Sequence, residues 1–412
     1  MLYKIGLFLI PFENFFFAPS AGWAAIAPIV FFIYFFQNIK WIGPILKKEK
    51  KLIIGSLVII LISFLFSLIY GTNIKAIVRN FITYFLGITF YFSLTIRYRA
   101  SKKNLQKDFN VLFLAYFLSS LVGLFQWLIY KENVKFIIKI INSISKRSYY
   151  PRVQFTFTEP SFTSMHLYGV ILILYLFFKK GNIRITKLQK YCTFIFPILA
   201  IILEKSSRLI LDTLVILTII FFYKCLFSKK KIWIKFFIII NVSGILLFTY
   251  INRDTLAVIL GKKDPRIEKI LNEGIYSDGS LASRYFRINA SLKGYCKNKL
   301  NVITGYGIGN IKLPLLLGYE EARKEYTNSY VDEVNQLKFF NGHSLFCMYI
   351  KIISEFGIVV LGIILISLYS KKFFLEYMII LYLYLQFDSY AFYSIWFYLY
   401  LKKYLKIKEG GI

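Results

Sequence analysis

The chain has 412 residues, of which 57% are hydrophobic and 18% charged, and its mean hydropathy is +0.58. It carries 52 Lys and Arg against 21 Asp and Glu, a net charge of +31. In a soluble protein this excess would indicate nucleic-acid binding, but long apolar runs separate the basic residues here. The composition therefore argues against a soluble enzyme, a nucleic-acid binder, a disordered chain and a disulfide scaffold.

Long apolar runs predict about twelve membrane-spanning helices, because about 20 apolar residues are needed to cross the hydrocarbon core of a bilayer. The first run contains Pro11 and Glu13 and is interpreted as a retained signal anchor. The predicted fold class is therefore an all-α polytopic membrane protein. The predicted spans are 4–18, 21–38, 52–70, 75–96, 108–130, 160–178, 187–203, 208–226, 232–251, 357–370, 373–387 and 389–401.

Basic residues gather in every second connection between these spans. The rule that cytoplasmic loops carry the excess of Lys and Arg places these connections and both termini in the cytoplasm, which requires an even number of spans. The segments 131–159 and 252–356 then face outward. The basic groups are Lys47, Lys48, Lys50 and Lys51; Arg97, Arg99, Lys102 and Lys103; Lys179, Lys180 and Arg184; Lys229, Lys230 and Lys231; Lys371 and Lys372; and Lys402, Lys403, Lys406 and Lys408.

The outer segment 252–356 divides the chain into three parts: 1–251 with nine spans, the segment itself, and 357–412 with three spans and a cytoplasmic tail. It contains about half of the acidic residues. So long a connection is usually functional. The cytoplasmic loops are too short for a nucleotide-binding domain and contain no phosphate-loop motif, so ATP use is not indicated.

Residues 343–370 are too long for one span. At 1.5 Å per residue a single helix would be about 42 Å long, whereas the hydrocarbon core is about 30 Å thick. We predict a break at Gly357, with an interfacial helix from His343 to Phe356 before span ten. Lys351 and Glu355 would then pair at the surface.

The two histidines, His166 and His343, are both expected near the outer face. His343 is either a polar residue at a helix start or an acid/base or sugar-phosphate ligand, because neutral imidazole accepts a proton near pH 7. His166 follows Glu159 by two helical turns and is either an interior helix contact or a substrate ligand. Helix capping alone would explain Glu159 and Pro160 at the start of a span.

Four arginines on the predicted outer side are candidates for binding phosphate, since a guanidinium group can bind two phosphate oxygens at once. Arg208 begins span eight and can pair with Asp212 four residues later, an arrangement that would also be purely structural. Arg284 and Arg287 lie in the large outer segment, and Arg152 lies shortly before Glu159.

Gly305, Gly307 and Gly309 alternate in the outer segment, where they permit either a simple tight loop or close approach of the backbone to a ligand. No His and Cys cluster has the spacing of metal ligands, and no outward Asp-x-Asp pair occurs. We therefore predict neither a metal nor a cofactor. A disulfide between Cys296 and Cys347 is left open.

Several of the short motifs described above, taken in chain order, resemble those of the bacterial O-antigen polymerase and O-antigen ligase superfamily. The resemblance covers about residues 75–370. The glutamate, proline and serine that enter span six resemble polymerases more than ligases. Val153 departs from the pattern, because members of the superfamily often have glycine after the arginine that corresponds to Arg152. The matching segments are Arg152, Phe157 to Ser161, Ser207 with Arg208, Arg284, Gly305 to Gly309, His343 with Ser344, and Ser354 to Gly357.

The resemblance implies a GT-C-like membrane glycosyltransferase that inverts the anomeric centre and needs neither metal nor nucleotide. Its donor would be a glycan on undecaprenyl pyrophosphate, and its acceptor a sugar hydroxyl of a second lipid-linked repeat. The reaction would occur at the periplasmic face of the bacterial inner membrane, with a chain-length regulator as a possible partner.

The resemblance also implies roles for individual residues. Arginines would stabilise the departing pyrophosphate, and His343 or Glu159 would orient or deprotonate the acceptor hydroxyl. The implied catalytic residues are His343, Arg284, Arg208 and Glu159. The implied substrate-binding residues are Arg152, Arg287, Gly305, Gly307 and His166.

Three alternatives share parts of this pattern. An O-antigen ligase would move the finished glycan to lipid A core with the same topology and donor. A flippase for lipid-linked oligosaccharides would usually show two similar halves, and no internal repeat is evident. A secondary transporter would carry charges at mid-membrane, of which the sequence offers Glu13, Asp212 and Asp388.

Overall fold

The computed structural model describes most of the chain and divides it into two compact units. Unit 1 comprises Met1–Leu57, Arg79–Leu217 and Leu368–Ile412, and unit 2 comprises Val58–Val78 and Thr218–Ser367. Every regular element in the described part of the chain is a helix, which confirms the predicted all-α class. The described residues are 1–14, 26–41, 43–44, 47, 49–100, 103–145, 148, 150–181, 183–204, 206–227, 268–269, 272–274, 277, 279–326, 334–335, 337 and 344–407.

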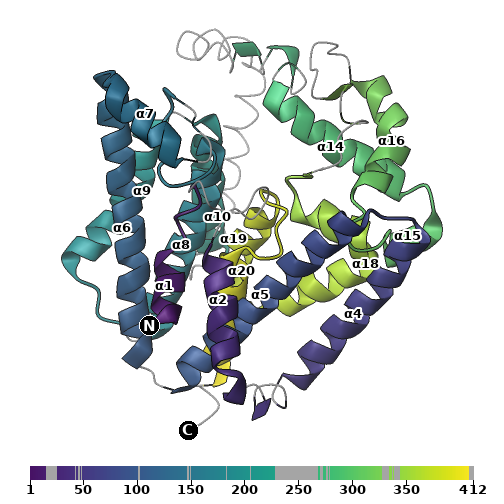
Figure 1. Ribbon diagram of the computed structural model, residues 1–412, viewed down its shortest axis with the longest axis horizontal. Helices are drawn as coiled ribbons and strands as arrows, with labels where there is room; N and C mark the ends of the chain where they lie inside the picture. The colour runs from purple at the N-terminus through teal and green to yellow at the C-terminus, as the bar shows by residue number, and fades with distance from the viewer. Residues whose placement is uncertain are drawn as a thin grey trace. The chain divides into compact units, whose positions relative to one another are not determined.

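Three long helices of unit 1 lie side by side, namely α6 (Lys103–Lys131), α8 (Pro160–Gly181) and α9 (Lys187–Glu204) (Figure 1). Helix α1 packs against α6, and α20 packs against α8. The other helices that lie wholly or largely in unit 1 are α1 (Leu2–Phe8), α2 (Ala27–Gln37), η1 (Ile39–Trp41), α5 (Ile74–Ala100), α7 (Lys135–Ile144), α10 (Ser207–Phe227), η3 (Lys371–Phe373), α19 (Phe374–Tyr384) and α20 (Tyr393–Ile407).

A buried ion pair joins α5 to α6 in unit 1. The Arg97 guanidinium donates to both carboxylate oxygens of Asp108, at 3.0 Å from Nε and 2.8 Å from Nη2. Asp108 is fully buried, and the Arg97 guanidinium also lies 5.2 Å from the centre of the Tyr3 ring. The pair therefore ties α1, α5 and α6 together around one enclosed charge.

Unit 2 is organised by the close crossing of α14 (Gly279–Tyr295) and α16 (Lys312–Glu325). A Cβ added to Gly294 would lie 1.8 Å from the Pro314 carbonyl oxygen, and one added to Gly318 would lie 2.0 Å from that of Ala290. The two glycines therefore let the helix backbones touch. The other helices that lie wholly or largely in unit 2 are α4 (Lys50–Ile69), α15 (Lys299–Thr304) and α18 (Met348–Leu368).

Five helices of the described residues are long and apolar enough to cross a membrane. They are Lys50–Ile69, Ile74–Tyr98, Asn104–Lys131, Pro160–Phe178 and Met348–Leu368. The first four coincide with predicted spans three to six. The last contains residues 357–368 of predicted span ten and also residues 348–356, which were expected to lie at the interface. Several long apolar helices therefore indicate a protein embedded in a membrane.

Helix α4 has the polarity expected of a helix that faces lipid. Ser63 and Ser67 are buried, whereas Leu61, Leu65 and Leu68 are more than half exposed. In water this would be an inverted arrangement, but in a bilayer small polar residues face the protein and leucines face the acyl chains. The side-chain pattern thus agrees with the membrane assignment made from length and hydropathy.

The remaining predicted spans are matched only in part. Helices α9 and α10 coincide with spans seven and eight. Helix α1 ends at Phe8, before Pro11, and its seven residues are too short to cross a bilayer alone. Helix α2 lies within span two, of which residues 21–25 lie outside the described residues, as does span nine. The count of twelve spans and the sidedness of the loops stay predictions.

Replacing Asp108 by Ala should destabilise unit 1, because the substitution leaves the partly buried Arg97 guanidinium without its partner. Loss of one member of a buried ion pair costs about 3–5 kcal/mol. Thermal unfolding of the purified protein in detergent would measure the change. The matched control is Glu325→Gln, which removes the carboxylate of the exposed Lys293–Glu325 pair and should shift the unfolding temperature little. Equal shifts for both variants would contradict the assignment.

Candidate functional site

The predicted start of span six is held in place by the N-terminal segment of the chain. The Thr156 carbonyl oxygen accepts from the backbone N–H groups of Glu13 and Asn14, at 2.9 and 3.0 Å. Its hydroxyl donates to the Pro11 carbonyl oxygen at 2.6 Å. Helix α8 then begins at Pro160, as the sequence predicts. Glu159 therefore lies at a fixed helix N-terminus, where a negative charge is favourable.

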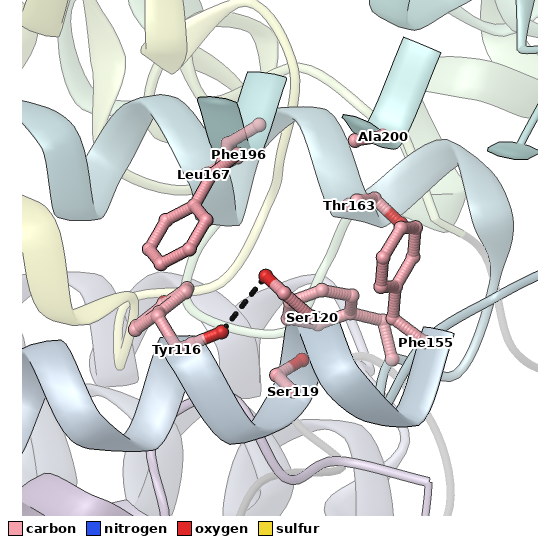
Figure 2. Close-up of a pocket in the computed structure, with 9 residues that line it drawn as sticks. Tyr116, Ser119, Ser120, Phe155, Thr163, Leu167, Phe196 and Ala200 are labelled. Atoms are coloured by element: carbon pink, nitrogen blue, oxygen red, sulfur yellow. Dashed lines mark hydrogen bonds between the residues drawn. The ribbon is translucent and has the colours of Figure 1, made fainter. Parts of the chain in front are cut away.

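The loop before α8 closes over a small hollow between α6, α8 and α9 (Figure 2). Phe155 has a left-handed backbone with φ of 53°, and its carbonyl oxygen accepts from the Gln126 side chain at 2.8 Å. A Cβ on Gly123 would lie 2.1 Å from the Phe155 ring, so the glycine makes room for it. The hollow has space for little more than a water molecule, so it is no sugar-binding site.

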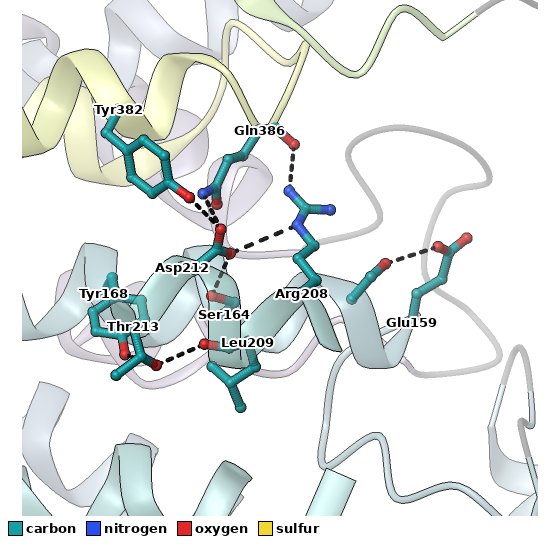
Figure 3. Close-up of polar contacts among 10 residues, drawn as sticks. Glu159, Ser164, Tyr168, Arg208, Leu209, Asp212, Thr213, Tyr382 and Gln386 are labelled. Atoms are coloured by element: carbon teal, nitrogen blue, oxygen red, sulfur yellow. Dashed lines mark hydrogen bonds and ion pairs between the residues drawn. The ribbon is translucent and has the colours of Figure 1, made fainter. Parts of the chain in front are cut away.

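The buried carboxylate of Asp212 is the centre of the polar cluster shown in Figure 3. It accepts from Ser164 Oγ at 2.6 Å, from Gln386 Nε2 at 2.8 Å and from the Tyr382 hydroxyl. These donors come from α8, α19 and the turn that follows α19. A carboxylate inside an apolar bundle is stable only when such donors replace water.

Arg208 is anchored by this cluster. Its Nε lies 3.7 Å from an Asp212 carboxylate oxygen, which confirms the predicted i to i+4 pair. Its Nη2 donates to the Gln386 carbonyl oxygen at 3.0 Å. The guanidinium is half-buried in the first turn of α10 and is held on two sides, so it is a cation with a fixed position.

Glu204 is a buried carboxyl group beside this arginine that the sequence analysis did not single out. It is the last residue of α9, beyond the end of predicted span seven, and is only 1% exposed. Burial raises the pKa of its carboxyl to about 8, although the Thr163 and Ser206 hydroxyls and the charges of Arg152 and Arg208 oppose the rise. Neither carboxylate oxygen has a well-formed hydrogen bond within the described residues. Glu204 therefore holds a proton at neutral pH.

His166 lies in the interior of unit 1 and not at an open site. Its Nε2 is 3.0 Å from a carboxylate oxygen of Glu13, and its ring stacks on Phe157 with centroids 4.8 Å apart. The Tyr393 hydroxyl donates to the His166 carbonyl oxygen at 2.8 Å. This geometry favours the interpretation as an interior helix contact. The pairing with Glu13 could not be read from the sequence, since 153 positions separate the two residues.

In unit 2 the three alternating glycines serve backbone packing. Gly305, Gly307 and Gly309 all have left-handed φ, at 73°, 95° and 82°. A Cβ on Gly307 would lie 2.2 Å from the backbone nitrogen of Ser67, and a Cβ on Gly305 would lie 2.5 Å from that of Phe356. The sequence left open whether these glycines serve a loop or a ligand, and every contact described here is made with the protein itself.

The same loop meets the kink of α18. Gly357 has non-helical torsions inside α18, which confirms the predicted break. The Gly309 N–H donates to the Glu355 carboxylate at 3.0 Å, and the Ser63 hydroxyl donates to the Glu355 carbonyl oxygen at 2.9 Å. Two motifs that were noted separately in the sequence, at 305–309 and 354–357, are therefore one structural unit.

Two expectations about this region are wrong. The helix begins at Met348 and not at residue 343, because residues 344–347 are non-helical. Lys351 and Glu355 are buried, at 5% and 0% exposure, and do not form a surface pair. The reason is that the loop and α4 cover this turn of α18, a contact that spacing along one helix cannot reveal.

The two predicted arginines of α14 lie on one aromatic ring. The guanidinium carbons of Arg284 and Arg287 are 5.0 and 5.5 Å from the centre of the Phe346 ring. Arg287 is buried and donates from Nη1 to the Ser344 carbonyl oxygen at 2.9 Å. Phe346 has a left-handed φ of 52°. Arg287 thus fixes the segment before α18, and Arg284 is the more exposed of the pair.

The structure therefore brings the predicted residues together in two sets. Arg152, Arg208 and Glu159 lie in unit 1, with His166 in the interior of that unit. Arg284, Arg287, Gly305 and Gly307 lie in unit 2, and His343 lies outside the described residues. Among the residues with a described position, no three His, Cys, Asp or Glu side chains converge as a metal site would require, and Cys296 and Cys347 are both free thiols.

Comparison of the chain with protein-family models, with curated proteins and with solved structures gives no match. The resemblance to the O-antigen polymerase and ligase superfamily therefore rests on the order of its short sequence motifs.

Replacing Gly307 by Ala should destabilise unit 2 by at least about 2 kcal/mol. A left-handed backbone alone costs a residue with a side chain about 1–2 kcal/mol, and the new methyl group would overlap α4. Thermal unfolding in detergent would measure the loss. The control is Gly362→Ala, where a Cβ meets no atom within 4 Å and the helical propensity of alanine is better. Comparable losses in both variants would contradict the packing role.

Replacing Glu204 by Gln should stabilise the protein increasingly as the pH rises. The folded-state pKa of about 8 lies above the ordinary glutamate pKa of 4.5. Between these pH values the unfolded state binds fewer protons than the folded state, so the wild type loses stability with rising pH. The amide variant lacks this loss. The unfolding temperatures of the wild type and the variant should therefore differ little at pH 5 and clearly at pH 8. A difference between the proteins that does not depend on pH would show that Glu204 is not the titrating group.

Proposed function

We propose that this chain is a membrane glycosyltransferase of the O-antigen polymerase type. It would join glycan repeat units carried on undecaprenyl pyrophosphate into a polysaccharide, at the periplasmic face of the bacterial inner membrane. The proposal rests on the order of the sequence motifs in a helical membrane protein. It also rests on one observation at the level of side chains, the anchored arginine at the start of α10.

Arg208 has the features that phosphate stabilisation requires. Asp212 and the Gln386 carbonyl hold it on two sides, so little reorganisation is needed when negative charge develops on a leaving group. Arg152 lies near enough for both arginines to lower the pKa of Glu204. Because that carboxyl stays protonated at neutral pH, it leaves the two positive charges available to an anion.

The proposed transfer is a single displacement at the anomeric carbon of the donor glycan. The acceptor hydroxyl oxygen forms the new glycosidic bond as the bond between the anomeric carbon and the pyrophosphate oxygen breaks. The bonding electrons leave with undecaprenyl pyrophosphate, whose charge the arginines stabilise. The hydroxyl proton passes to a base, for which Glu159 at the N-terminus of α8 and His343 are the candidates.

The remaining residues take supporting roles in the proposal. Arg284, the more exposed arginine on the Phe346 ring, is proposed to contact substrate phosphate, and Arg287 to hold the segment before α18. Gly305 and Gly307 are proposed to shape the backbone of unit 2 and not to touch substrate. His166 is proposed to act indirectly, by its contacts in the interior of unit 1. The chemistry as proposed uses no metal and no nucleotide.

An assay with purified protein and lipid-linked repeat units would test the proposal. The parent protein should produce a ladder of polymer lengths. Arg208→Ala should lower the rate by about 100-fold or more, the typical cost of removing one group that stabilises transition-state charge. Arg208→Lys should restore part of it, because a lysine supplies the charge without the paired donors.

The control for this assay is Arg184→Ala. Arg184 is an exposed residue outside both sets of candidate residues. It should leave the ladder unchanged, and all variants should be matched for the amount of folded protein in the membrane. An unchanged ladder from Arg208→Ala would overturn the site. With lipid A core added as a second acceptor, transfer to it in place of a ladder would identify a ligase. The absence of any glycan transfer by the parent protein would overturn the proposed function.

A further inference from the structure

Helix α7, at Lys135–Ile144, is the one helix of ten residues or more in unit 1 that has no buried residue among those described. It follows α6 after three residues. Phe136 is 74% exposed, and Ile137, Ile140 and Ile144 are also exposed. A free helix of this length is barely stable in water, so such a helix needs a surface on which to lay its apolar side.

The sequence of α7 separates into two faces at helical spacing. Phe136, Ile140 and Ile144 recur at intervals of four residues on one face. The opposite face carries Lys135 and Lys139, both exposed, together with Asn142 and Ser143. A helix with large apolar residues on one side and basic residues on the other is typical of those that lie in the interface of a bilayer.

The residues around the end of α6 are those of a membrane interface. The Lys131 ammonium lies 5.3 Å from the centre of the Trp127 ring, and the Tyr130 and Tyr150 rings meet edge to face at 5.1 Å. Tryptophan, tyrosine and lysine gather at the level of the lipid headgroups. The candidate span Asn104–Lys131 ends at this level, three residues before α7 begins.

Helix α6, which precedes α7, also exposes apolar side chains. On α6, Leu114, Phe125 and Leu128 are exposed, and this helix is one of the five candidate spans. We propose that α7 is an interfacial helix that lies in the headgroup region of the bilayer at the end of α6. Phe136, Ile140 and Ile144 would enter the acyl boundary, and Lys135 and Lys139 would contact lipid phosphates. This inference does not depend on the proposed glycosyltransferase function.

The position of α7 also bears on the loop that follows it. The helix ends at Ile144, and the chain then continues through Tyr150 to the loop before α8, where Arg152 and Glu159 lie. The Tyr150 hydroxyl donates to the Asn133 side chain at 3.2 Å. An interfacial α7 would therefore set the depth at which this loop meets the membrane surface.

Spin labels on the full-length protein in lipid nanodiscs would test this placement. Cysteines would be introduced singly at Ile140 on the apolar face and at Lys139 on the basic face, with Cys192, Cys225, Cys296 and Cys347 replaced by Ala. The nanodiscs would contain phosphatidylethanolamine and phosphatidylglycerol. The ratio of accessibility to molecular oxygen over that to a water-soluble nickel chelate should be several-fold higher at 140 than at 139.

Two results would overturn the proposal. Equal access of the nickel chelate to both labels would place α7 in water. A label at 140 that is shielded from both reagents would show that protein covers this face, either a second copy or another part of the chain. A label at Phe136 provides a second reading of the same face should the Ile140 variant fail to fold, and a matching thermal unfolding profile checks the cysteine-free background.

Discussion

A carboxylate enclosed among apolar helices must obtain all of its hydrogen bonds from the protein, because no bulk water reaches it. Asp108 meets this requirement with the guanidinium of Arg97 on the preceding helix, whereas Asp212 and Glu355 gather donors from more distant parts of the chain. Asp212 binds groups from α8 and from the end of α19, and Glu355 binds the backbone of the glycine loop. The positions of these helices therefore follow from three charges that could not be buried alone.

The features that were predictable from sequence are those that depend on neighbouring residues. Pro160 begins α8 because its ring suits a first helical turn. Gly357 breaks α18 because glycine readily adopts the left-handed φ of 82° that the kink requires. Arg208 and Asp212 pair because four residues bring two side chains onto one face of a helix. In each case the relevant information lies within a single turn or a single element.

The features that could not be predicted depend on packing between elements. Tyr382 and Gln386 meet Asp212 across at least 170 positions of the chain, and no spacing rule connects them. Glu204 looks in the sequence like the end of a span, and only burial beside Arg208 makes its protonation unusual. An exposed Lys351–Glu355 pair was expected because spacing along one helix does not reveal the loop that covers it. That loop comes from residues 305–309.

The glycine loop changes what a short motif means in this class of chain. Its backbone N–H groups at Tyr306, Gly307 and Gly309 donate to Ser354 and Glu355, and its α-carbons touch α4 and α18. A search pattern keyed on these glycines would therefore gather chains that share a helix crossing. Such a pattern reports a shared scaffold, and what distinguishes one such chain from another must be sought among side chains that the pattern does not mention.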